Sequence, residues 1–304
     1  MVSKNSSWIG YVFAAACGAS LLSLHVEVAK LSAQDQPPKA KSAVKPTTPE
    51  LLKTFLSEFV EITPGRGKYP ASFMMGTERG PWSEQPAHRV TLATPFHIAK
   101  YEVPQNLYEA VMGSNPSRWK GPRNSAENFT WQDAQDFCQR ITRLLREGKL
   151  IAETEAIRMP TEAEWEYCCR AGTTTPYSFG EIATAPGDVG VKASVLDKFG
   201  WSTSNAAGND PPVGALQPNP WGLYDMHGYL WEFVSDAWNE NYVGARPDGS
   251  AISNSDVVSR RTVRGGSWME RYECHRSAYR QPVVESAKGE GIGLRCIKSI
   301  GAAK

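Results

Sequence analysis

The sequence predicts an irregular, loop-rich α+β domain that contains a few short strands and about three helices. Two observations lead to this fold class. The 304-residue chain combines 26 glycines and 21 prolines with 10 tryptophans and 11 tyrosines, so many turn formers accompany many large aromatic side chains. Residues 180–299 show no long helical periodicity, whereas short strands are expected within residues 59–65 and 88–103.

Three segments are predicted to be helices. Thr130 and Asp133 can form a capping box, and the apolar residues that follow recur at helical spacing up to a closing glycine. Thr161 and Glu164 can form a second capping box in front of the stretch "EAEWEYCC". The third helix, over residues 104–112, begins with a proline and ends before a glycine, as helices often do.

The N-terminal residues are predicted to lie outside this domain. Residues 8–24 carry no charge, and the pattern of residues 1–33 is typical of a secretory signal peptide that is cut after Ala33. The protein is therefore expected to be exported, to the periplasm or the outside of the cell. An uncleaved membrane anchor is the alternative, although the apolar run is slightly short for a spanning helix. Cys17 is a weaker candidate for a lipoprotein-type site.

The composition also sets the domain boundaries and excludes one class of partner. Residues 34–55 are rich in proline and lysine and poor in bulky apolar residues, so they are predicted to be a linker. The folded domain is then expected over residues 56–300. Because the formal net charge is only +1, the composition gives no reason to expect nucleic acid as a partner. Contact with a membrane is expected only through an uncleaved N-terminal anchor.

A series of motifs resembles one known family. They follow one another in the family's order: "FMMGTERG", "EQPAHRVTL", "YEVPQNLYEAVMGSNPSRWKG", "RMPTEAEWEYCCRAGT", "PVGALQPNPWGLYDMHGYLWEF", "VRGGSW" and "RSAYR" with "GIGLRC". This set resembles the formylglycine-generating enzyme, or sulfatase-modifying factor, family over roughly residues 59–299. The resemblance implies a compact α+β fold similar to that of C-type lectins. The founding enzymes of the family oxidise a cysteine of a sulfatase to formylglycine, using oxygen and a copper(I) ion held by two thiolates.

The positions of those two thiolates are changed in this chain. By the family's spacing after "GGSW", the first falls at Glu270, and the second falls near Tyr272. A carboxylate and a phenol are poor ligands for soft copper(I), so copper is not expected. Cys274 lies two residues from the second position. A shifted alignment could therefore restore one thiolate but not two.

The resemblance leaves two functions open. The first is an exported, non-catalytic member that acts as a binding or accessory module, because the thiolate pair is missing. The alternative is an oxidoreductase of the formylglycine-generating type, which converts a substrate cysteine or another side chain with oxygen and a metal. Its candidate catalytic residues are Cys274 together with Ser267, Arg276 and Arg280, which match family positions beside the site. Either function implies a protein or peptide partner, such as a sulfatase.

The resemblance also implies a disulfide. Cys169 and Cys296 match positions that are bridged in exported members of the family, and the export signal makes a disulfide permissible. The alternative is a pair of buried free thiols. Cys138 lies on the apolar face of its predicted helix and is expected to belong to the core.

A calcium loop is the last feature that the resemblance implies. The stretch "YDMHGYLWEF" matches the family loop in which two side chains and two backbone carbonyls bind calcium. In this sequence the four ligands would be Asp225, Gly228, Leu230 and Glu232. The family's usual asparagine after the glycine is Tyr229 here. The alternative is a packed turn in which Glu232 accepts hydrogen bonds from backbone amides.

Overall fold

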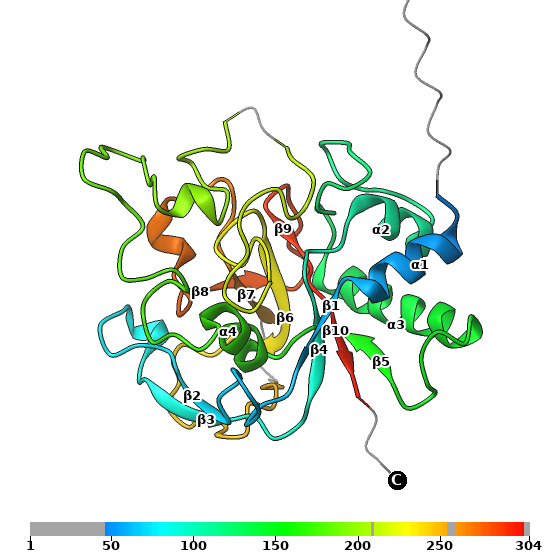
Figure 1. Ribbon diagram of the computed structural model, residues 1–304, viewed down its shortest axis with the longest axis horizontal. Helices are drawn as coiled ribbons and strands as arrows, with labels where there is room; N and C mark the ends of the chain where they lie inside the picture. Colours follow the sequence, from blue (N-terminus) through cyan, green and yellow to red (C-terminus); the bar gives the residue numbers. More distant parts are fainter. Residues whose placement is uncertain (1–45, 208–209, 254–258, 301–304) are drawn as a thin grey trace, which may run out of the picture. The chain divides into compact units, whose positions relative to one another are not determined.

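The computed structural model describes residues 46–207, 210–253 and 259–300 (Figure 1). The predicted signal peptide and the first part of the predicted linker lie outside the described residues. The described residues form one compact unit. No helix among the described residues is long and apolar enough to cross a membrane.

Four α-helices are present in the described part of the chain, and their bounds are α1 (Thr48–Ser57), α2 (Gln105–Met112), α3 (Trp131–Glu147) and α4 (Glu162–Arg170). The predicted helices are confirmed as α2, α3 and α4. Both predicted capping boxes are formed, because the Thr130 and Thr161 hydroxyls accept from the amides of Asp133 and Glu164. The predicted linker is wrong at its C-terminal end. There α1 begins with a further capping box and buries two apolar side chains, Leu52 and Phe55.

Two four-stranded sheets and a hairpin complete the domain. The first sheet is antiparallel and has the order β1 (Phe59–Ile62), β4 (Phe96–Ala99), β10 (Ile297–Ser299) and β5 (Ala156–Arg158). The second has the order β8 (Arg280–Val284), β7 (Arg260–Arg264), β6 (Trp231–Ala237) and β9 (Ile292–Gly293). The hairpin consists of β2 (Ser72–Met75) and β3 (His88–Thr91). The expected strands are thus confirmed, and strands of seven residues or fewer agree with the predicted irregular α+β class.

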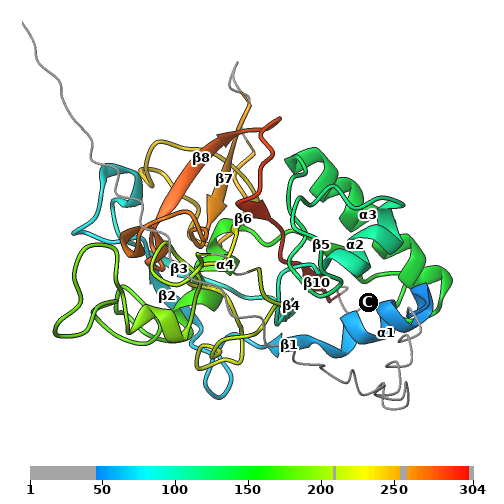
Figure 2. The same cartoon turned by 90° about the horizontal axis from the view of Figure 1, so that it is seen from above.

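The helices and the second sheet lie in different parts of the domain. Helices α1, α2 and α3 gather on one side, whereas β6, β7, β8 and α4 lie on the other (Figures 1 and 2). Two large apolar clusters fill the interior, and tryptophans contribute to both, with Trp131 and Trp231 in one and Trp165 and Trp221 in the other. Large aromatic side chains therefore supply core volume in a domain of short strands.

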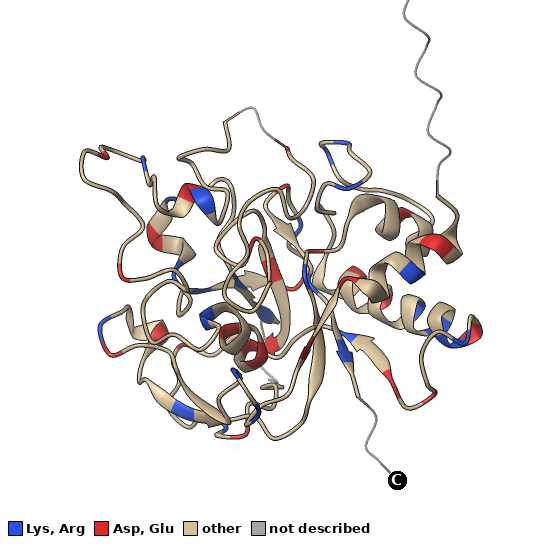
Figure 3. Ribbon diagram, viewed as in Figure 1, with Lys and Arg blue, Asp and Glu red and all other residues tan. Residues whose placement is uncertain are grey.

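Charged side chains are also part of the interior. Arg264 and Arg295 are among the largest fully buried side chains, each with 0 % relative exposure. Acidic and basic residues lie close together around α4 (Figure 3). A buried charge is costly unless it is paired and hydrogen-bonded. The pairing of these buried charges also fixes the position of the loop between β7 and β8.

Candidate functional site

The candidate site is the loop that joins β7 to β8, residues 265–279. It opens with Gly265 and Gly266, whose φ angles of 101° and 78° favour glycine. The buried ring of His275 packs against Gly266, where an added Cβ atom would lie 2.9 Å from the ring. The ring nitrogens of His275 lie 2.9 Å and 3.2 Å from the carbonyl oxygens of Arg271 and Ser267. Burial lowers the pKa of His275 to about 4, so the ring is neutral at pH 7 and can donate its single N–H to one of these two carbonyls.

Cys274 is the candidate nucleophile in this loop. Among the five cysteines that the structure describes, it alone is not fully buried. Burial of its side chain raises the pKa of the Cys274 thiol, while a hydrogen bond with Tyr279 acts in the opposite direction. The thiolate is the reactive and metal-binding form of cysteine. Cys274 is therefore protonated at neutral pH, beside a phenol that offers no basic group.

The two positions that the resemblance assigns to the family's thiolates are Glu270 and Tyr272. The Glu270 carboxylate accepts a long hydrogen bond of 3.5 Å from the indole of Trp231. Tyr272 starts a short 3₁₀ turn, η3 (Tyr272–His275), and its carbonyl accepts from the Tyr177 hydroxyl at 2.9 Å. The loop thus brings one thiol near a carboxylate and phenols. This donor set does not fit a two-thiolate copper(I) site.

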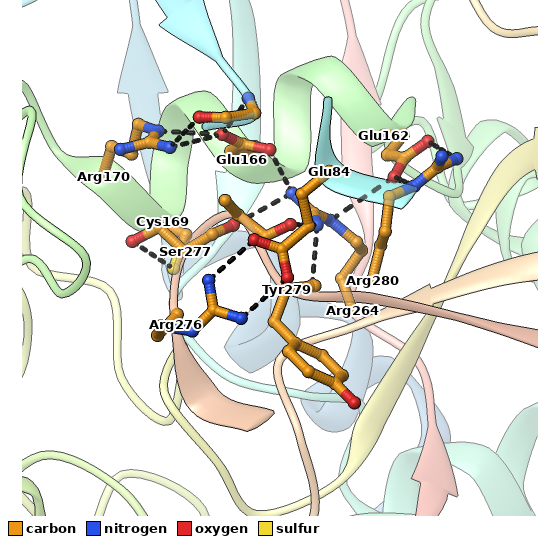
Figure 4. Close-up of polar contacts among 12 residues, drawn as sticks. Glu84, Glu162, Glu166, Cys169, Arg170, Arg264, Arg276, Ser277, Tyr279 and Arg280 are labelled. Carbon is orange, nitrogen blue, oxygen red and sulfur yellow. Dashed lines mark hydrogen bonds and ion pairs between the residues drawn. The ribbon is translucent and has the colours of Figure 1, made fainter. Parts of the chain in front are cut away.

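Two of the predicted site arginines are held in ion pairs (Figure 4). Arg276 donates to both carboxylate oxygens of Glu84, at 2.6 Å and 2.7 Å. Arg280 does the same with Glu162, at 2.6 Å and 2.8 Å, and also donates to the carbonyl of Asn239 at 2.8 Å. Such bidentate pairs fix both position and orientation. Their geometry indicates that these arginines anchor the loop to its surroundings.

A second pair of arginines, Arg264 and Arg170, extends this network to α4 (Figure 4). Arg264 donates to Glu166 and to the carbonyls of Ser277 and Tyr279 in the loop, at 2.9 Å and 2.6 Å. Glu166 also accepts from Arg170 at 2.8 Å. Burial alone would raise the pKa of Glu166, but the two arginines outweigh it and the pKa is lowered. No sequence motif singled out Glu166, although its place in the capped helix α4 was the available signal.

Ser267 lies beneath the loop surface. Its side chain is completely buried, and its hydroxyl accepts from the amide of Met269 at 3.3 Å. The predicted set of Cys274, Ser267, Arg276 and Arg280 therefore lies in one loop region, but three of its members have structural partners. Only the Cys274 thiol combines partial exposure with a potentially reactive atom.

The predicted disulfide between Cys169 and Cys296 is wrong in this structure, where both thiols are free. The Cys169 sulfur lies 3.5 Å from the Ser277 hydroxyl, in the apolar cluster around α4. Cys296 belongs to the other cluster and is a hydrogen-bond neighbour of Cys138. The two cysteines of the prediction therefore face different parts of the core.

Two of the predicted calcium ligands, Glu232 and Gly228, accept hydrogen bonds from protein groups. Both oxygens of the Glu232 carboxylate accept from Arg295, at 2.8 Å and 3.1 Å, and one also accepts from the indole of Trp165 at 2.7 Å. The Gly228 carbonyl accepts from the amide of Trp201 at 2.9 Å. The guanidinium of Arg295 thus supplies the positive charge that calcium would bring. Arg295 was not among the predicted site residues, and its place inside the apolar stretch "GIGLRCI" was the available signal.

The other two predicted ligands differ from each other. Asp225 is buried, and one of its oxygens accepts from the amide of Gly214 at 2.8 Å, while the other has no partner among the described residues. Leu230 donates its amide to Glu102 at 3.1 Å. The described residues contain no group of three His, Cys, Asp or Glu side chains that could hold a metal. A site of two carboxylates and two backbone carbonyls is a different donor set, so the calcium loop stays a prediction.

Comparisons with known proteins agree with this fold. Residues 49–300 match the family described as "Sulfatase-modifying factor enzyme 1-like domain". Among solved structures, the chain resembles PvdO from Pseudomonas aeruginosa with a TM-score of 0.66 and 29 % identity, covering 80 % of this chain and 94 % of PvdO.

Two curated relatives point to different activities. The chain is 29 % identical over 243 residues to the chaperone protein LppX of Paenibacillus barcinonensis, which covers 69 % of this chain and 82 % of LppX. It is 32 % identical over 151 residues to the formylglycine-generating enzyme of Mycobacterium tuberculosis, which covers 46 % of this chain and 50 % of that enzyme. The match thus spans half the length of the enzyme and most of the chaperone.

Proposed function

Because the chain belongs to the sulfatase-modifying factor enzyme 1-like family, we propose that it is an exported, non-catalytic member that acts as a binding or accessory module for a protein partner. The observation that carries the proposal is the chemistry of the β7–β8 loop. Glu270 and Tyr272 stand where a copper site needs thiolates, and Cys274 is a lone thiol with a raised pKa. One protonated thiol cannot form a bis-thiolate copper(I) centre.

Two further observations support an accessory role. Arg276 and Arg280 are saturated by buried glutamates, so neither guanidinium is available to orient a reacting group. The similarity to LppX, which is named a chaperone, extends over most of that protein. Export is proposed from residues 1–33, whose composition is typical of a signal peptide. A protein or peptide partner, a sulfatase for example, follows from the family.

The alternative is a divergent oxidase, and one observation favours it. Cys274, the half-buried thiol of the loop, lies beside the Tyr279 hydroxyl and close to Glu270. Such an enzyme would use oxygen and a metal to oxidise a substrate side chain. The oxidation that the family's enzymes carry out with two thiolates would then have to proceed with the single thiol of Cys274.

One experiment separates the two functions. The full-length protein would be incubated with copper(I), oxygen and a cysteine-containing sulfatase peptide, and the peptide would be analysed by mass spectrometry. We expect no formylglycine, and we expect X-ray absorption to detect no two-sulfur copper site. Cys274→Ser is the matched variant. Formylglycine formation that disappears in Cys274→Ser would overturn the non-catalytic proposal.

A further inference from the structure

A surface pocket lies apart from the β7–β8 loop. It has a volume of about 340 Å³, close to the lower end of the range for small-molecule pockets. Strand β2, the segment that follows it and the turn after α4 form its walls, and none of its lining residues belongs to residues 265–279. The pocket therefore requires an explanation of its own.

The rim of the pocket carries hydroxyl groups with free hydrogen-bonding capacity. The Ser72 hydroxyl accepts from Arg89 at 2.9 Å, and the Thr77 hydroxyl accepts from the amide of Arg79 at 3.2 Å. Each of these hydroxyls therefore keeps its own hydrogen to donate. The Thr173 hydroxyl donates to a carbonyl at 2.9 Å, which leaves its lone pairs as acceptors. The rim thus offers both donors and acceptors.

A carboxylate is fixed at the same pocket. One oxygen of Glu78 accepts from the amide of Ala87 at 3.0 Å, and both residues line the pocket. This hydrogen bond positions an otherwise exposed side chain. An ionised carboxylate accepts at several lone pairs, so the second oxygen can receive hydroxyl groups of a ligand.

The apolar part of the lining is aromatic and flexible. Phe73 packs against Tyr167, with ring centroids 5.3 Å apart, and both residues line the pocket. Met74, on the same strand, is 44 % exposed. Aromatic rings and a thioether provide a surface for the C–H groups of a ligand. One face of the ligand should therefore be apolar.

The charge of the pocket argues against an anionic ligand. Arg170 is the single arginine or lysine in the lining, and it is nearly fully buried. Its guanidinium donates to Glu166 at 2.8 Å and to the carbonyls of Gly76 and Thr175, at 2.9 Å and 3.3 Å. All three of its nitrogens are thus engaged, and its charge is balanced by Glu166. With Glu78 at the rim, the pocket would repel phosphate or a carboxylate.

From these features we propose that the pocket binds a neutral ligand that is rich in hydroxyl groups and has one apolar face, that is, a single saccharide unit. Hydroxyls of the sugar would exchange hydrogen bonds with Ser72, Thr77, Thr173 and Glu78. The C–H face of the sugar would lie against Phe73. The site is independent of the proposed accessory function and adds a second ligand to it.

The test uses the full-length protein with glucose, mannose and N-acetylglucosamine as probes. Saturation-transfer NMR detects contact with the protein, and calorimetry gives the dissociation constant. Thr77→Val and Thr173→Val remove hydroxyl groups but keep the side-chain shape, and we expect each to weaken binding about tenfold. Thr174→Trp fills the pocket from its exposed rim and should abolish binding.

Controls keep the result interpretable. Thr63→Val lies outside the pocket lining and should leave binding unchanged, and melting curves verify that every variant is folded. Inorganic phosphate is the anionic probe and should not bind. The proposal is overturned if none of the three sugars binds. It is also overturned if folded Thr174→Trp binds a sugar as well as the wild type does, or if phosphate binds and the sugars do not.

Discussion

Replacing Arg295 with methionine should strongly destabilise the domain. The guanidinium has 0 % exposure and binds the carboxylate of Glu232. It also donates to the carbonyls of Ala99, Lys100 and Tyr224, at 3.0 Å, 2.7 Å and 2.8 Å. Removing one partner of a buried ion pair costs about 3–5 kcal/mol. Because three carbonyls also lose a charged donor, we expect the upper part of that range.

Urea unfolding of the full-length protein measures this effect. Arg143→Met is the matched control, because Arg143 lies exposed on α3 and its loss should cost less than about 0.5 kcal/mol. Adding Glu232→Gln to Arg295→Met removes the unpaired carboxylate and should restore part of the stability. The double-mutant cycle then gives the coupling between the two side chains.

The same titrations decide between the ion pair and a calcium site. If Arg295 supplies the charge for Glu232, calcium and a chelator should leave the wild-type midpoint at the same urea concentration. A midpoint that falls when calcium is removed would refute this reasoning and restore the predicted calcium loop. A stability of Arg295→Met equal to that of Arg143→Met would refute the magnitude.

Three further predictions follow from buried groups. The first concerns the thiols of protein exported to an oxidising compartment. Because Cys138 and Cys296 are neighbours in the core, non-reducing peptide mapping should find them either linked to each other or both free. A peptide that links Cys169 to Cys296 would contradict the structure. Burial raises the pKa of the Glu102 carboxyl, so the protonated form is favoured in the folded state and the wild type should lose stability as pH rises above about 4.5. Glu102→Gln removes this loss of stability. The urea midpoint of the variant minus that of the wild type should therefore be larger at about pH 8 than at about pH 5. An equal difference at both pH values would argue against a protonated Glu102. Arg280→Lys keeps the charge but loses the bidentate geometry with its glutamate and should cost about 1.5–3 kcal/mol in urea unfolding; a cost below about 0.5 kcal/mol would show that the pair is not a structural anchor.

Local features of the fold could be predicted from the sequence because their physics is local. The capping boxes at Thr130 and Thr161 involve residues three positions apart, so the sequence alone predicted where α3 and α4 begin. The same signal at Thr47 and Glu50 was present but was overridden by the proline- and lysine-rich composition around it. The sequence also identified the positions that the resemblance assigns to a thiolate pair, and the residues there are Glu270 and Tyr272.

The pairing of distant residues was decided by the tertiary structure. Strand β10 lies between β4 and β5, and α3 packs against β5, so Cys296, just before β10, meets Cys138 on α3. Cys169 is carried by α4, which packs against β2, β6 and β7 instead. Likewise Glu232 and Arg295 are 63 positions apart and meet because β6 and the segment between β9 and β10 lie side by side. Sequence patterns record periodicity and local capping. The order of the strands determines which buried charged groups pair with each other and which thiols are neighbours.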